Sequence, residues 1–395
     1  MQALLKLSRG IDWLNTQVGK YVIWLILGST FISGVNAVVR KAFNISSNGF
    51  LEVQWYLFAA SFLLAAGYTL LQGEHVKVDV VSSRFSKRTQ IWIDVFGYIV
   101  FLTPMCMAVL WYGIPFFTRA FVSGEMSSNA GGLIRWPVYL MMPLGFSLLW
   151  LQGVSELIKR LAFLKGLIED PTAKKAEKTA EEELAESIRK LAEAAKGNGS
   201  NKAKASERAT HTMEFIAHNL APIMFAGLIC FLLVGCPVAF SLGACGLFFA
   251  FIGIELNVLP EALLQALPLR IYGIMQNDTL LAIPFFTLMG LILERSGMAE
   301  DLLDTIGQLF GPIRGGLALA VIFVGALLAA TTGVVAASVI SMGLISLPIM
   351  LRYGYDRRLA AGVIAASGTL AQIIPPSLVL IIIADQLGRS VRDMY

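Results

Sequence analysis

The chain has 395 residues, of which 56% are hydrophobic and only 15% are charged. Soluble domains carry roughly 45–50% apolar and about 25% charged residues, so this composition excludes a soluble globule, a disordered chain and a disulfide-stabilised secreted scaffold. The formal net charge is +4 and the basic residues are spread over several loops, which excludes the clustered basic face of a nucleic-acid-binding protein. The sequence predicts an all-α, polytopic membrane protein.

The first part of the chain contains four apolar runs, at residues 21–39, 55–71, 91–117 and 136–158. A helix crosses a bilayer in roughly 20 residues, and in lipid only a helix satisfies the backbone of such a segment by itself. Ahead of the first run, apolar residues recur every three or four positions over residues 4–18, which predicts a short interfacial helix. We therefore expect a four-helix membrane bundle over residues 1–160.

The basic residues predict the orientation of this bundle. Lysines and arginines are frequent before the first run, between the second and third runs and after the fourth run, whereas each of the other two loops holds two. Cytoplasmic loops carry the excess of Lys and Arg. We therefore expect the N-terminus in the cytoplasm.

Residues 161–213 are rich in Lys, Glu and Ala and contain no run long enough to cross a membrane. Asp170 can cap a helix that has Pro171 at its first position, and residues 197–200 form a flexible Gly-Asn-Gly-Ser segment. We interpret this region as a charged cytoplasmic linker between two membrane modules. A binding site for a cytosolic partner is the alternative.

From residue 214 the apolar character returns in shorter pieces that are broken by Gly and Pro. Such pieces are typical of discontinuous membrane helices, whose ends and unwound carbonyls bind a substrate and its coupling ion near the middle of the bilayer. Residues 214–395 are therefore predicted to form a transport module, with residues 1–160 as an accessory bundle.

The first break comprises Thr331, Thr332 and Gly333, between two apolar runs that are short for a full crossing. The chain could enter the bilayer, turn here and leave on the same side as a re-entrant hairpin. The hydroxyls and the freed backbone would supply oxygen ligands for sodium and amides for a carboxylate. A simple helix interruption or a close helix crossing between small residues would use the same sequence.

The second break combines small and helix-breaking residues, namely Ser367, Gly368 and Thr369 followed by Pro375, Pro376 and Ser377. Two successive prolines remove two amide donors and stop the helix, which leaves carbonyl groups without helical partners. An ion would satisfy these carbonyls. In a proline-kinked span, neighbouring hydroxyls would do the same.

Asp94, Glu52 and Asp385 are the acidic residues nearest to membrane depth, and intramembrane acids are candidates for function. Asp94 lies within two turns of Lys87 and Arg88, which favours a structural role. Glu52 precedes an apolar run and Asp385 lies near the end of one, so both are expected to be hydrated.

The sequence contains no recognisable catalytic constellation. The histidines lack HExxH spacing, the cysteines lack a CxxC pair, and no Ser–His–Asp order, paired glycosidase carboxylates or GxxxxGK[ST] segment is present. We therefore expect no enzymatic activity, no cofactor and no direct ATP-driven transport.

Several short motifs occur along the chain in a fixed order. The first module contains Glu52, Trp55 and the run GEHVKVD at residues 73–79. The second contains GCPVAF at residues 235–240, LAIPFF at 281–286, YGYD at 353–356 and IIPPS at 373–377. This set resembles the small (Q-type) and large (M-type) membrane subunits of tripartite ATP-independent periplasmic (TRAP) transporters, fused into one chain. A large subunit of that family normally continues with a second, inverted half, so we expect the chain to be truncated within the large subunit.

The resemblance implies a sodium-driven elevator in the bacterial inner membrane, whose large subunit moves the substrate site against a scaffold that includes the small subunit. It implies a periplasmic substrate-binding protein and a small organic-acid substrate as partners besides membrane lipid, with sodium as the coupling ion. Carried onto this sequence, the substrate site takes Thr331, Thr332, Gly333, Pro375, Pro376 and Ser377. The sodium sites take Thr332, Gly333, Ser338, Ser367, Gly368 and Thr369.

Two positions in the hairpin depart from the family pattern. Val334 stands where the family often has a hydroxyl, and Ser338 stands where it often has a carboxylate. The departures suggest a variant subgroup resembling the mannitol or chloroaromatic-acid type. Two other interpretations remain open: a non-transporting scaffold or split-subunit component, and a channel, which the discontinuous helices disfavour.

Overall fold

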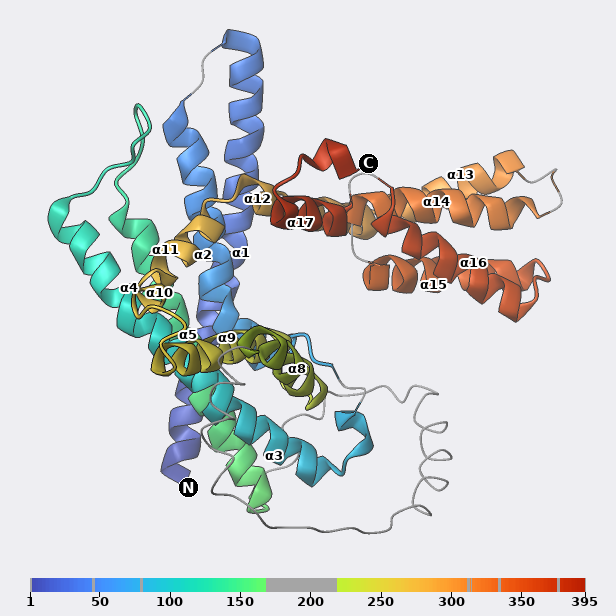
Figure 1. Ribbon diagram of the computed structural model, residues 1–395. Coiled ribbons are helices and arrows are strands. Elements are labelled where there is room, and N and C mark those ends of the chain that lie inside the picture. Colours follow the sequence, from blue (N-terminus) through green and yellow to red (C-terminus); the bar gives the residue numbers. More distant parts are fainter. Residues whose placement is uncertain are drawn as a thin grey trace. The chain divides into compact units, whose positions relative to one another are not determined.

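The computed structural model describes residues 2–44, 47–78, 81–167, 219–310, 313, 315–332, 335–374 and 377–394. Helices dominate this part of the chain (Figure 1), and the β-structure found in it consists of two isolated bridges. Five of its helical stretches are long and apolar enough to cross a membrane. The predicted all-α, polytopic fold is confirmed.

The chain divides into two compact units. The first contains Met1–Leu25 and Ala59–Tyr272, and the second contains Ile26–Phe58 and Gly273–Tyr395. Residues 220–272, which belong to the predicted large-subunit module, therefore pack with the first unit. The module boundaries at residues 160 and 213 follow composition, and they stay a prediction.

The first helix, α1, extends without interruption from Gln2 to Phe43. At 1.5 Å per residue its 42 residues are about 60 Å long, roughly twice the thickness of the hydrocarbon core. The prediction of a separate interfacial helix over residues 4–18 is wrong. No proline separates that segment from the apolar run, and the intervening Gly19 is covered by the ring of Tyr68.

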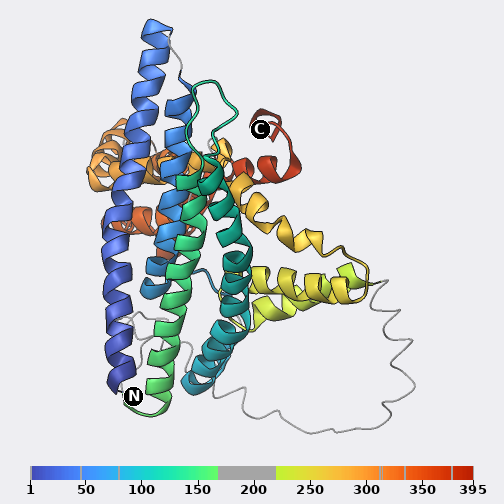
Figure 2. The same ribbon diagram turned by 90° about the vertical axis from the view of Figure 1, so that its left-hand side faces the viewer.

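The first unit also contains most of the helices between residues 59 and 275. These are the end of α2 (Asn48–Gln72), then α3 (Lys87–Gly97), a π-helical turn η2 (Tyr98–Leu102), α4 (Thr103–Ser123), α5 (Trp136–Leu164), α8 (Leu220–Leu233), α9 (Val238–Glu255), α10 (Ala262–Gln265) and most of α11 (Leu267–Met275). Figure 2 shows α4 and α5 side by side. The core of this unit joins η2 and α5 to α9, through residues that include Phe101, Leu149 and Phe240.

Glycines allow the membrane helices of this unit to approach closely. A Cβ on Gly145 of α5 would lie 2.6 Å from the carbonyl oxygen of Leu63 on α2. A Cβ on Gly67 of α2 would overlap the Asn15 side-chain oxygen on α1. Because lipid supplies no hydrophobic force between helices, such small-residue contacts stabilise membrane bundles through close packing.

The loop after α2 pairs with the loop before α9. The Val238 amide donates to the Val76 carbonyl at 2.9 Å, and Lys77 forms an isolated antiparallel bridge with Pro237. Gly235 has φ of +96°, and a Cβ there would lie 2.5 Å from Cβ of Ser82. The GEHVKVD and GCPVAF motifs therefore meet in the fold.

His75 lies half-buried in this junction. Its ring is 4.9 Å from the ring of Phe240, and Nε2 lies 3.4 Å from the carbonyl oxygen of Ala66. Burial lowers the pKa of His75 below its ordinary value of 6.5; the Ala66 carbonyl partly opposes this, and the nearby charge of Lys77 adds to it. The folded protein therefore holds His75 neutral.

We expect the protein to lose stability as the pH falls below about 6.5, and His75→Gln to reduce that loss. Because the pKa of His75 is lower in the folded protein than in the unfolded chain, its contribution to the free energy of unfolding is complete above the unfolded pKa of about 6.5. That contribution is lost as the pH falls from there towards the folded pKa. The check is the thermal midpoint of the purified protein against pH. Equal pH dependence of the two proteins would assign the effect to other groups.

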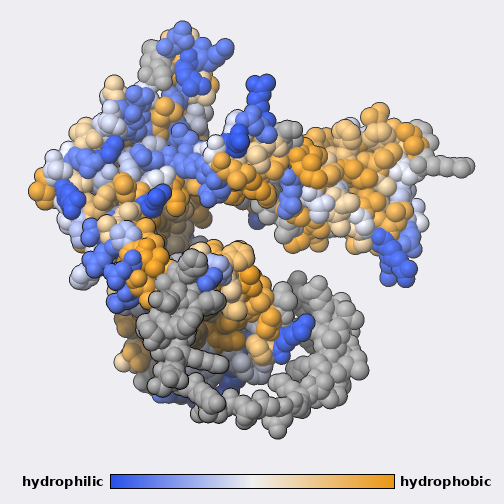
Figure 3. All heavy atoms as spheres, viewed as in Figure 1, coloured by the Kyte–Doolittle hydropathy of each residue, from blue (hydrophilic) through white to orange (hydrophobic). Residues whose placement is uncertain are grey.

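The second unit contains a compact group of helices between Gly273 and the end of the described chain. They are α12 (Asp278–Arg295), α13 (Met298–Phe310), α14 (Gly316–Thr332), α15 (Val335–Arg352), α16 (Arg357–Thr369), the 3-10 turn η3 (Leu370–Gln372), α17 (Leu378–Leu387) and the 3-10 turn η4 (Val391–Met394). Val324, Met342 and Ile364 lie in its core. Its outer surface is also apolar over large areas (Figure 3), as expected for helices in lipid.

Candidate functional site

The two helices that flank the first predicted break form a hairpin. A Cβ on Gly325 of α14 would lie 3.7 Å from Cε of Met342 on α15, and these two residues are equally far from the connection between the helices. The arms have 17 and 18 residues, about 26 Å each, which is less than the roughly 30 Å of hydrocarbon. This length suits the predicted re-entrant hairpin.

The tip of the hairpin is only partly described. The backbone of Thr331 and Thr332 forms the end of α14. Gly333 and Val334 lie outside the described residues, as do Pro375 and Pro376 of the second break. Their assignment to substrate or sodium stays a prediction.

Helix α16 packs against both arms of the hairpin. A Cβ on Gly325 would lie 2.5 Å from Oγ of Ser367, so the Ser367 side chain of α16 packs directly against the α14 backbone. A Cβ on Gly368 would overlap Cγ2 of Val339 and lie 3.1 Å from its backbone nitrogen, so the α16 backbone packs directly against Val339 of α15. The structure thus brings Ser367 and Gly368 of the second break next to the start of α15, where Ser338 lies.

Two of these hydroxyls are buried, and the chain orients that of Ser367. Ser338 is 1% exposed and Ser367 is fully buried. The Ser367 hydroxyl donates to the carbonyl of Ile364 at 2.8 Å. Since this bond uses the hydroxyl proton, the oxygen keeps lone pairs for a cation, and neutral oxygens are ligands that hard cations accept.

Thr369 differs from its neighbours in the predicted sodium set. Its side chain is exposed, and its hydroxyl donates to the carbonyl of Ala366 at 2.8 Å. Helix α16 ends at Thr369, and η3 follows directly. Thr369 therefore marks the break but lies at the edge of the buried junction.

Ser377 has a structural role that the sequence did not predict. It is fully buried and is the N-cap of α17, where its oxygen accepts the Leu380 amide at 3.2 Å. An N-cap serine satisfies one of the unpaired amides at the start of a helix. Ser377 thus restarts the helix after the break.

A side-chain bond links the start of α12 to the end of α17. Asn277 caps α12 by accepting the amide of Thr279, and its own amide donates to Asp385 at 2.7 Å. Asn277 is absent from the predicted site. Its position before an apolar helix is a recognisable start signal, but nothing in the sequence indicated its bond to Asp385.

Glu52 is not hydrated, contrary to the prediction. Helix α2 begins at Asn48, so Glu52 lies inside its second turn, and its side chain is only 2% exposed. Helix α2 starts before the apolar run does, which is why the carboxylate lies in the helix rather than ahead of it.

Asp94 forms a buried ion-pair network in the first unit. Its oxygens accept Lys77 Nζ at 2.8 Å and Arg160 Nε at 2.9 Å. These ion pairs agree with the structural role expected for Asp94. Its partners are not the neighbouring Lys87 and Arg88, which lie about 10 Å back along α3, but Lys77 and Arg160 of α5.

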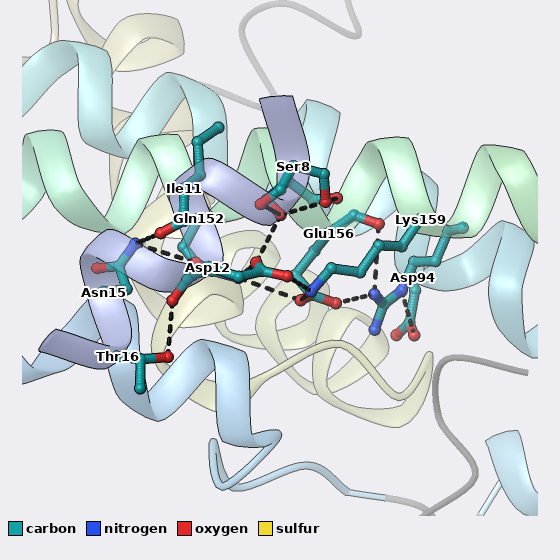
Figure 4. A network of polar contacts seen from close by, with 11 residues as sticks. Ser8, Ile11, Asp12, Asn15, Thr16, Asp94, Gln152, Glu156 and Lys159 are labelled. Carbon is teal, nitrogen blue, oxygen red and sulfur yellow. Dashed lines mark hydrogen bonds and ion pairs between the residues drawn. The ribbon is translucent and has the colours of Figure 1, made fainter. Parts of the chain in front are cut away.

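The network continues along α5 towards α1, and Figure 4 shows Asp94, Glu156, Lys159 and Asp12 in it. Arg160 pairs with Glu156, and Lys159 bridges Glu156 at 2.7 Å and Asp12 of α1 at 2.8 Å. Ser155 donates to the same Asp12 carboxylate at 2.7 Å. Three carboxylates thus balance three cations, and the network holds α1, α3 and α5 together.

Two family models match the chain. "Tripartite ATP-independent periplasmic transporters, DctQ component" matches residues 29–163, and "Tripartite ATP-independent periplasmic transporter, DctM component" matches residues 225–395. The two matches together cover most of the chain.

Individual relatives are permease proteins of such transporters. The chain is 34% identical over 164 residues to the C4-dicarboxylate TRAP transporter large permease of Rhodobacter capsulatus, covering 42% of this chain and 36% of that protein. It is 29% identical over 174 residues to the isethionate TRAP transporter permease DctMQ of Oleidesulfovibrio alaskensis, covering 44% and 26%. It is 29% identical over 179 residues to the 2,3-diketo-L-gulonate TRAP transporter large permease of Escherichia coli, covering 45% and 40%.

The chain spans about a third of the length of these curated relatives. The relatives are transporter permeases rather than enzymes. Its spanning helices and its family indicate a multi-pass inner-membrane protein. The chain belongs to the tripartite ATP-independent periplasmic transporter family and joins a small and a large membrane component in one polypeptide.

Proposed function

We propose that this chain is the permease part of a sodium-coupled secondary transporter, which imports a small organic acid delivered by a periplasmic binding protein. The observation that supports the proposal is the convergence of two helix breaks, in which α14 and α15 both pack against α16 at Ser367 and Gly368. Discontinuous helices that meet inside a membrane module are the arrangement that secondary transporters use for substrate and ion.

In the proposed site, the buried oxygens of Ser338 and Ser367 are sodium ligands, together with Thr332, the Gly333 backbone and the end of α16. The substrate carboxylate is assigned to backbone amides at the predicted break, because amides without helical partners bind anions. Two of the relatives are named for C4-dicarboxylate and 2,3-diketo-L-gulonate, which are both carboxylates. A carboxylate substrate suits such a site.

The test is uptake by the full-length transporter, reconstituted in liposomes with its binding protein. Saturable uptake that requires both the binding protein and a sodium gradient supports the proposal. Uptake that is unchanged without the gradient overturns the coupling. A complete, folded assembly that binds its partner but transports nothing would support the scaffold interpretation.

Thr332→Val is expected to raise the sodium concentration for half-maximal uptake by about tenfold, because losing one ligand bond costs about 1–2 kcal/mol. Assembly should be unchanged. Thr305→Val is the matched control, since the Thr305 hydroxyl is exposed and donates only to the Asp301 carbonyl of its own helix. If Thr332→Val reduces assembly and sodium dependence equally, Thr332 has a structural role instead.

A further inference from the structure

Three exposed cations lie close together in the chain, at the end of η1 and the start of α3. Arg84 ends the 3-10 turn η1 (Ser82–Arg84), and Lys87 and Arg88 form the first turn of α3. All three side chains are exposed, and among the described residues none of them forms an ion pair. Asp94, the acid further along the same helix, is already bound by Lys77 and Arg160. The group therefore keeps its positive charge.

An exposed apolar stripe continues from these cations along α3 and into the π-helical turn η2. Trp92 is 55% exposed, Phe96 is 48% exposed and Ile99 is 54% exposed. Their spacing of four and three residues places them on one helix face, one turn after Arg88. The opposite face of α3, with Ile91 and Asp94, is buried in the first unit.

The position of this face along the helix follows from length. The continuous stretch Lys87–Ser123 has 37 residues, whereas roughly 20 cross the hydrocarbon core. Its segment between Asp94 and Arg119 is free of charged residues and suits that core. The start of α3 therefore lies in the headgroup layer, with Trp92 at the interface, where tryptophan is enriched.

We propose that this face binds an anionic phospholipid. The headgroup phosphate sits among Arg84, Lys87 and Arg88, and the acyl chain lies along Trp92, Phe96 and Ile99. Charge complementarity selects an anionic headgroup, because each Lys or Arg near the surface adds attraction to anionic lipid. The apolar stripe selects a lipid over a free anion, because it lies where an acyl chain runs. The positive end of the α3 dipole adds to the same field.

The experiment uses the purified full chain in detergent with palmitoyl-oleoyl phosphatidylglycerol or palmitoyl-oleoyl phosphatidylcholine, and native mass spectrometry measures the lipid bound. We expect a preference of about tenfold or more for phosphatidylglycerol, since each cation contributes roughly a fivefold factor at an anionic surface. The triple variant R84Q/K87Q/R88Q should bind the two lipids about equally. Trp92→Gln should weaken the binding of both lipids and leave the preference for phosphatidylglycerol unchanged.

The matched control is R352Q/R357Q/R358Q, which removes the same charge from three exposed arginines in the second unit. It should keep the preference for phosphatidylglycerol. If the two triple variants lose the preference for phosphatidylglycerol equally, the lipid is attracted by positive charge anywhere on the protein, and the proposal is overturned. Displacement of the lipid by excess inorganic phosphate would reveal a phosphate site instead. A change of oligomeric mass in R84Q/K87Q/R88Q without a change in lipid binding would make the face an interface between copies.

Discussion

Replacing Arg160 with methionine is expected to destabilise the protein by about 3–5 kcal/mol, the cost of breaking a buried ion pair from one side. The Arg160 side chain is only 6% exposed and neutralises both Asp94 and Glu156. Methionine keeps much of the volume but leaves the two carboxylates without this partner. A lower yield of monodisperse protein and a thermal midpoint lower by about 5 °C or more would be measured.

Two variants make this test specific. Arg135→Met removes an arginine that pairs at 2.8 Å with Glu125, whose side chain is 40% exposed, so its loss should cost less than about 1 kcal/mol. Combining Arg160→Met with Asp94→Asn and Glu156→Gln should recover part of the stability, because no uncompensated carboxylate remains at either contact. A midpoint of Arg160→Met equal to that of the unmodified protein would contradict the role assigned to the network.

Gly368→Ala is expected to reduce sodium-dependent uptake by about tenfold or more, because one methyl group forces α15 and α16 apart at the proposed site. The new Cβ would overlap Cγ2 of Val339 and lie 3.1 Å from its backbone nitrogen, and overpacking of this kind costs about 1–3 kcal/mol. Uptake by the full-length transporter and its thermal midpoint would both be measured.

A second substitution that relieves this overlap should restore uptake. Val339→Ala removes the overlapping methyl group, so the double variant should recover part of the uptake that Gly368→Ala loses. Gly362→Ala is the control on the same helix, since a Cβ there would meet no atom within 4 Å. Full activity of Gly368→Ala, or a double variant no better than the single one, would show that this contact does not limit transport.

The local features of the fold could be predicted from the sequence. The apolar runs gave the spanning helices, because their length and composition are set by the bilayer. The second break was also predicted, since α16 ends at Thr369 and α17 begins at Leu378. Such signals are contained in a few neighbouring residues.

Contacts between distant segments could not be predicted in the same way. Arg160 lies 66 residues after Asp94, and Asn277 lies 108 residues before Asp385. Which of several nearby charges pairs with Asp94 depends on how α3 and α5 pack, and no local pattern records that. The close approach of Gly325 to Ser367 could not be predicted for the same reason, because the sequence does not show which distant residue a glycine in an apolar run packs against.

The ion-pair network also sets an order of events during synthesis of the chain. Asp94 leaves the ribosome 66 residues before Arg160, and at about 5–20 residues per second this interval lasts roughly 3–13 seconds. The interval between the synthesis of Asp12 and that of its partner Ser155 is longer, because 143 residues separate them. During that time neither acid has these partners, so α1 and α3 reach the membrane before the bundle can close around them. The emergence of α5 is therefore the step that closes the network, and a chain interrupted before α5 would leave Asp12 without Lys159 and Asp94 without Arg160.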